Sequence, residues 1–149
     1  MARMVDTKEY LDMVCGLLAE GKTSVPVPVA GTSMTPFLHP GDMVYLDLPK
    51  TPLKKGDIVL FTRPDGRYIL HRIVSVNRDG SFTMLGDAQT EREPVAGPEF
   101  IHARVTGALH KGRRLTPKSR RWRFFATVWM HPLVVPLRRT ILIVVSKFR

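Results

Sequence analysis

Short apolar runs separated by proline, glycine and aspartate occupy the sequence between residues 24 and 109. Runs rich in valine, isoleucine, leucine and phenylalanine, with turn residues at each end, are typical of β-strands. The runs read VPVPVAG, DMVYLDL, DIVLF, YILHRIVSV, SFTMLG and IHARVTGAL. Pro64-Asp65-Gly66 separates the third run from the fourth and predicts a hairpin. The pattern predicts a mainly β fold, a small coiled antiparallel sheet.

Two segments of different character flank this β region. The apolar residues of the first segment recur at helical spacing, at Tyr10, Leu11, Val14, Leu17 and Leu18. This spacing predicts a short amphipathic helix, with Asp6 as its N-cap and Gly21 as its stop. Because 149 residues suffice for one ordinary core, we expect an N-terminal helix at 1–23, a β domain at 24–110 and a C-terminal tail at 111–149.

The excess positive charge of the chain lies in the tail. Residues 111–149 contain 11 lysines and arginines and no acidic residue, whereas the formal net charge of the whole chain is +10. Such a segment favours an anionic surface, either phospholipid headgroups or nucleic acid. Prolines and paired arginines interrupt its apolar residues, so a simple transmembrane helix is not expected. Trp122, Trp129 and the flanking arginines favour a segment lying among lipid headgroups; a soluble tail closing over the core is the alternative.

The amino-terminal residues show neither a signal-peptide nor an anchor pattern, because charged residues interrupt them. Seven basic residues stand between the β region and the apolar part of the tail, at Lys111, Arg113, Arg114, Lys118, Arg120, Arg121 and Arg123. By the positive-inside rule this cluster leaves the β domain on the cytoplasmic side of a membrane. We therefore expect a membrane-associated protein that contacts anionic headgroups.

The cysteine and histidine residues of the sequence do not form the patterns of a metal site or a disulfide. The single cysteine, Cys15, excludes an intramolecular disulfide and a cysteine-based zinc site. The five histidines lack the spacings of common zinc motifs. We expect neither a metal nor a cofactor.

Ser33 stands at a cramped bend in VAGTSMTPFLHPGDMVYL, residues 29–46. Serine is a weak nucleophile unless a base takes its proton. His71 is the candidate base, because strand alternation places it with Ile69 and Ile73 in an apolar setting that keeps an imidazole neutral. The alternative is a core histidine bonded to a backbone carbonyl.

Three boxes in order carry a family resemblance: Gly31-Thr32-Ser33-Met34-Thr35-Pro36, then Gly56-Asp57-Ile58-Val59 with Leu70-His71-Arg72-Ile73-Val74, then Gly86-Asp87-Ala88. They resemble the serine-peptidase superfamily of type I signal peptidases and autocleaving LexA-like repressors. Histidine at position 71, where most bacterial signal peptidases have lysine, resembles the archaeal and endoplasmic-reticulum branch. The resemblance implies Ser33 as nucleophile, His71 as general base and Asp87 as the group that orients the imidazole. Glu93 is a second acidic candidate.

The resemblance also implies how a substrate is held. The backbone N–H of Ser33, with Gly31 or Thr32 as neighbour, would form the oxyanion hole. Substrates in this superfamily are extended peptides with small residues one and three positions before the cut, paired against strands. We expect the cleft at Val27, Val29, Met34, Phe37, Tyr68 and Leu70. Phe37 replaces a common threonine and is expected on the substrate floor or facing a bilayer.

These observations predict a Ser-His serine endopeptidase of the signal peptidase I type. Its expected substrates are signal-peptide-like or leader-peptide segments of a preprotein, cut after small residues near a membrane. One alternative is a catalytically inactive peptide-binding scaffold. The other is a repressor-like module that binds nucleic acid through the basic tail. The sequence has no helix-turn-helix signature, so we expect no specific nucleic-acid partner.

Overall fold

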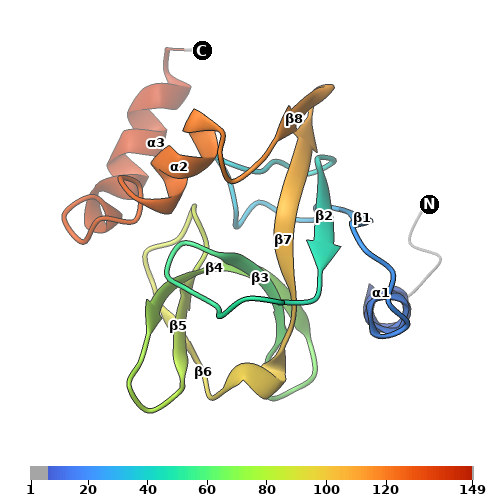
Figure 1. The fold of residues 1–149 in the computed structure, drawn as a ribbon. Helices are drawn as coiled ribbons and strands as arrows, with labels where there is room; N and C mark the ends of the chain where they lie inside the picture. The colour runs from blue at the N-terminus through green and yellow to red at the C-terminus, as the bar shows by residue number, and fades with distance from the viewer. Residues whose placement is uncertain (1–6, 149) are drawn as a thin grey trace.

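The computed structural model describes residues 7–148, and its centre is one antiparallel sheet (Figure 1). The strand order is β1-β2-β7-β3-β4-β5-β6, and β8 pairs with β7. The strands are β1 (Val25–Pro28), β2 (Met43–Asp47), β3 (Ile58–Thr62), β4 (Tyr68–Val76), β5 (Phe82–Leu85), β6 (Glu93–Val95), β7 (Ile101–His110) and β8 (Arg113–Leu115). A 3-10 turn, η1 (Pro98–Phe100), precedes β7. The mainly β, antiparallel fold predicted from the sequence is confirmed.

The β3–β4 hairpin forms at the predicted Pro64-Asp65-Gly66 turn. Gly66 has φ +89°, a backbone conformation that a residue without Cβ adopts at little cost. The hairpin register pairs Val59 with His71. Register shifts between Tyr45 and Leu46 and elsewhere in the sheet mark bulges, and bulges bend strands. The sheet is therefore coiled rather than flat.

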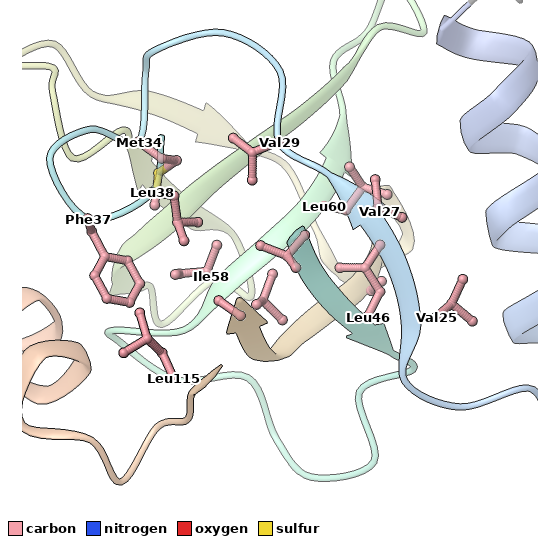
Figure 2. Packing of buried hydrophobic residues seen from close by; sticks show 14 of the residues in the cluster. Val25, Val27, Val29, Met34, Phe37, Leu38, Leu46, Ile58, Leu60 and Leu115 are labelled. Atoms are coloured by element: carbon pink, nitrogen blue, oxygen red, sulfur yellow. The ribbon is translucent and has the colours of Figure 1, made fainter. Parts of the chain in front are cut away.

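The two faces of the sheet bury separate hydrophobic clusters. Alternate residues of β3 face opposite ways: Ile58 and Leu60 belong to the larger cluster, and Val59 and Phe61 belong to the smaller one. The larger cluster joins the sheet to the first helix, to the segment after β1 and to the tail. Figure 2 shows Phe37 and Leu38 of that segment packed near Ile58 of the sheet. One continuous core thus includes residues from all three predicted parts of the chain.

The N-terminal helix, α1 (Thr7–Ala19), lies beside β1 (Figure 1). It buries Leu11, Val14 and Leu18, and the predicted apolar face is confirmed. Glycine at position 21 has φ +96°, and the helix ends before it. The predicted N-cap, Asp6, lies outside the described residues.

The tail folds back onto the domain. It contains α2 (Arg120–Ala126), η2 (Val135–Leu137) and α3 (Arg138–Ser146). Trp122 packs edge-on to Phe37 at 5.3 Å between ring centroids, and Trp129 packs against Phe125 at 5.6 Å. The prediction that both tryptophans lie among lipid headgroups is wrong, because both are at least 95 % buried in the larger cluster. Among residues 7–148, no helix is long and apolar enough to cross a membrane.

Candidate active site

Ser33 lies in the tight turn that follows β1, partly exposed to solvent. The residues after it anchor this turn: Met34 and Leu38 are buried in the larger cluster, and the N–H of Leu38 donates to the carbonyl of Met34. Gly31 precedes the serine with φ +76°, a left-handed conformation that glycine adopts readily. Apolar side chains below the turn therefore leave the serine on its outer side.

The glycine-aspartate box after β5 packs directly on the serine. The N–H of Ala88 donates to the carbonyl of Ser33 at 2.9 Å. A Cβ atom at Gly86 would lie 2.6 Å from the same carbonyl oxygen, so only glycine fits there. The first and third boxes of the sequence thus form one contact in the folded chain.

His71 and Ser33 line the same pocket, which has a volume of ≈ 220 Å³. His71 is 2 % exposed and packs beside Phe61 in β3. The predicted alternation of β4 is confirmed, because Ile69 and Ile73 belong with the smaller cluster on this face of the sheet. Burial lowers the pKa of His71 below its usual 6.5. The pocket thus joins a hydroxyl group to an imidazole that stays neutral at physiological pH.

Glu93, on β6, is the carboxylate beside this imidazole. Its Oε1 atom lies 3.6 Å from Nδ1 of His71, which makes no hydrogen bond within the described residues. Arg63 holds the same carboxylate through two hydrogen bonds, Nε to Oε2 at 2.9 Å and Nη2 to Oε1 at 2.8 Å. This pairing lowers the pKa of Glu93, and the resulting negative charge partly offsets the effect of burial on His71.

Asp87 makes a different contact from the one predicted for it. Arg72 donates from Nε to Oδ1 at 2.9 Å and from Nη2 to Oδ2 at 2.7 Å, and both side chains are completely buried. Arg72 follows His71 on β4 and therefore points to the opposite face of the sheet. The Asp87 charge still acts on His71, but it is the smallest of the named effects on its pKa. Asp87 is therefore paired with Arg72, and Glu93 is the carboxylate in contact with the imidazole of His71.

The backbone around Ser33 offers free donors for an oxyanion. Within residues 7–148, no acceptor takes the N–H of Thr32 or of Ser33. The carbonyl of Thr32 is engaged instead, since it accepts from the backbone and the hydroxyl of Thr35. Gly31 and Thr32 are both exposed beside the serine.

An apolar pocket of ≈ 280 Å³ continues the Ser33 pocket toward α1. The two pockets share Val29, Ala30, Tyr68 and Leu70. Of the residues predicted for the cleft, Val27 lines the apolar pocket and Met34 lines the serine pocket. Together the two pockets form a continuous groove along β1 and β4.

Phe37 does not reach this groove, and its prediction as substrate floor or bilayer contact is wrong. Its side chain is 0 % exposed and packs between Trp122 and Phe125 of α2. Phe37 is buried because the tail packs on the side of the turn opposite to Ser33, a tertiary contact that the local sequence does not indicate.

Sequence reasoning missed two groups of side chains around the site. Arg63 and Gln89 line the serine pocket. Arg138 and Trp129 bond the carbonyls of the 86–89 loop from the tail. Arg63 stands before the predicted hairpin turn, but its partner Glu93 lies 30 residues away, a separation that a local pattern does not reveal.

Comparison with protein families gives a match over most of the chain. The model of the Peptidase S24-like family matches residues 2–96, a segment that contains Ser33, His71, Asp87 and Glu93. No curated protein and no solved structure matches the chain. The match covers more than half of the chain and agrees with the shared pocket of serine and histidine. The chain therefore belongs to the Peptidase S24-like family, in the LexA/signal peptidase-like serine peptidase superfamily.

Proposed function

We propose that the protein is a Ser-His endopeptidase that cuts extended, signal-peptide-like or leader-peptide segments after small residues. The observation that carries this proposal is the pocket that contains both Ser33 and His71. Its base is neutral because burial lowers the pKa of His71, and a neutral imidazole is the form that accepts a proton.

The reaction follows from these groups. The Ser33 Oγ attacks the scissile carbonyl carbon while Nε2 of His71 takes its proton, and the N–H groups of Ser33 and Thr32 hold the oxyanion. The C–N bond then breaks, and His71 returns the proton to the leaving amine. Water, activated by the same imidazole, hydrolyses the acyl-enzyme and regenerates Ser33. Glu93 is the positioning residue for His71 in this proposal, in place of Asp87.

The apolar groove supports the substrate class. Val29 and Leu70 line the serine pocket, and its volume of ≈ 220 Å³ favours a small residue before the cut. Tyr68 and Val27 line the continuation beneath α1, where a further apolar residue of an extended peptide would lie. A leader peptide of a preprotein with a small residue before the cut and an apolar residue further along would fit both pockets.

The test offers a peptide library rich in small-x-small motifs to the wild type, Ser33→Ala and His71→Ala, with Ser75→Ala as the matched control. Ser75 lies on the same strand as His71 but bonds Asn77 outside the pocket. We expect cleavage after small residues by the wild type and the control, and at least about a 10³-fold loss of kcat/KM in the other two variants. Mass spectrometry identifies the bonds cut.

An intact library would contradict the proposal if the folded wild type still binds the peptides, since the protein would then be a scaffold. Cleavage confined to the protein's own chain would instead indicate a self-processing activity of the repressor kind. Equal cleavage by wild type and Ser33→Ala would exclude the serine as nucleophile.

A further inference from the structure

Most of the exposed large apolar side chains lie in the tail. Among residues 7–148 there are eleven such side chains, and eight of them fall between positions 124 and 148. Leu133 is 74 % exposed and Phe148 is 84 % exposed. The others in the tail are Phe124, Val128, Leu137, Ile143, Val144 and Val145. Soluble monomers rarely expose so many apolar groups from one short segment, and such patches mark interaction surfaces.

The sequence of α3 explains this exposure. Positions 141–145 are five consecutive aliphatic residues, and they occupy all sides of a helix rather than one stripe. Ile141 and Leu142 are partly buried against the core, whereas the three residues that follow are exposed. The helix therefore presents an apolar face that the domain does not cover.

Cationic side chains border this apolar helix. A broad pocket of ≈ 1080 Å³ is lined by Val145 of α3 and by Lys111, Arg113 and Arg121. Arg121 is fixed by the carbonyls of Pro36 and Phe37. The imidazole rings of His39 and His110 also line the pocket.

Within residues 7–148, no carboxylate forms a salt bridge with Lys111, Arg113 or Arg121. None of the salt bridges among the described residues involves a basic residue beyond position 110. Among the described residues that line the pocket, Asp42 is the one acidic residue. It is already bonded to His110 Nδ1 at 2.6 Å and to the N–H of His39 at 2.9 Å. The pocket therefore has a net positive charge beside an apolar surface.

We propose that this surface, formed by α2, η2, α3 and the pocket of Lys111, Arg113 and Arg121, docks onto an anionic phospholipid bilayer. Exposed apolar side chains enter the interface between headgroups and acyl chains, and the cations meet lipid phosphates. A bilayer fits better than nucleic acid because the cations adjoin long aliphatic side chains rather than a set of stacking aromatics. The surface contains neither Ser33 nor His71, so this proposal does not depend on peptidase activity.

Vesicle flotation tests the proposal with the full chain. The probes are vesicles of phosphatidylcholine alone and vesicles with about one third phosphatidylglycerol. One variant, Ile143→Ser/Val144→Ser/Phe148→Ser, removes apolar contacts, and another, Lys111→Gln/Arg113→Gln, removes charge. All five positions are exposed, so the fold is retained and a thermal melt verifies it. The controls are Met13→Ser/Leu48→Ser and Lys50→Gln/Lys55→Gln, which alter exposed residues elsewhere.

We expect the wild type and both controls to bind the anionic vesicles, and each tail variant to bind at least about tenfold more weakly. Added salt should weaken wild-type binding, because it screens the headgroup attraction. Failure of the folded wild type to float with anionic vesicles overturns the proposal. So does equal binding by all variants, or loss of binding in the charge variant alone. Binding to a DNA duplex without binding to vesicles would assign the surface to nucleic acid instead.

Discussion

At the scale of single residues, the environment of His71 sets the pH dependence of the proposed reaction. Burial lowers its pKa, so the imidazole is neutral at and above its ordinary value of 6.5 and charges only as the pH falls further. Because the neutral form is the base, kcat/KM should persist below pH 6.5 and then fall through the lowered pKa. A pH profile of kcat/KM for peptide cleavage measures this acid limb.

Glu93 should shift that limb when its charge is removed. Its carboxylate favours the protonated imidazole, so Glu93→Gln lowers the pKa of His71 further and moves the acid limb to lower pH. The substitution also frees the Arg63 cation, which acts in the same direction. Glu91→Gln, an exposed change on the same segment, is the control and should leave the limb in place. A limb that stays put or rises in Glu93→Gln would show that Glu93 does not act on the base.

Asp87 should matter for stability through Arg72. Both charges are completely buried, so Asp87→Asn leaves a buried guanidinium without its partner, at a cost of roughly 3–5 kcal/mol. Urea denaturation measures this loss. Asp65→Asn breaks an exposed pair with Arg67 and should change the midpoint little. Were Asp87 instead the group that orients His71, its variant would lose activity while keeping its unfolding midpoint.

The sequence could not separate the roles of the two acids. Asp87 and Glu93 both follow β5, within reach of the strand that carries His71. What decides between them is Arg72, because its guanidinium occupies both oxygens of Asp87 on the far face of the sheet. The contact of Arg72 with Asp87 joins two strands, so no local sequence pattern reveals it. The position of His71, in contrast, follows from the alternation of residues along a single strand.

At the scale of elements, the start of α3 holds the loop that packs on the serine. Arg138 is fully buried and donates to the carbonyls of Gly86, Gln89 and Trp129. Burial lowers its pKa to about 10, so it remains charged at neutral pH. Trp129 adds a hydrogen bond of 2.7 Å from its ring nitrogen to the carbonyl of Asp87.

Arg138→Met should loosen this loop. Two buried carbonyls, of Gly86 and Trp129, and the partly buried carbonyl of Gln89 lose a charged donor. We expect a loss of about 2 kcal/mol or more in the free energy of unfolding. Hydrogen exchange followed by mass spectrometry should show faster exchange at residues 86–89, together with a lower kcat. Arg139→Met, at the exposed neighbouring position, serves as the control. Unchanged exchange at the loop in a destabilised Arg138→Met would contradict the assignment.

The elements that sequence analysis predicted are those with a local signal. The periodicity of α1 and the turn residues of the β3–β4 hairpin are each contained in fewer than twenty residues. The tail has the composition of an interfacial segment, and the sequence does not reveal that Trp122 meets Phe37. That contact joins residues 85 positions apart. The indole ring of Trp122 is turned toward the core because it is buried in the larger cluster together with Phe37.

At the scale of the whole molecule, the sheet is completed by β7, a strand near the C-terminal end of the β region. β7 pairs with β2, β3 and β8, so it joins the two halves of the strand order. Met43 pairs with Leu109, a contact between distant parts of the chain, and pairings of this kind slow folding.

The position of Arg138 gives this arrangement a consequence for synthesis of the protein. The loop packed on Ser33 acquires its buried donors only after residue 138 has left the ribosome, and β7 must first join the two halves of the sheet. Chains fold progressively as they emerge. The nascent protein therefore carries its serine and histidine long before the pocket between them is fixed, and the order of translation itself delays maturation of the site.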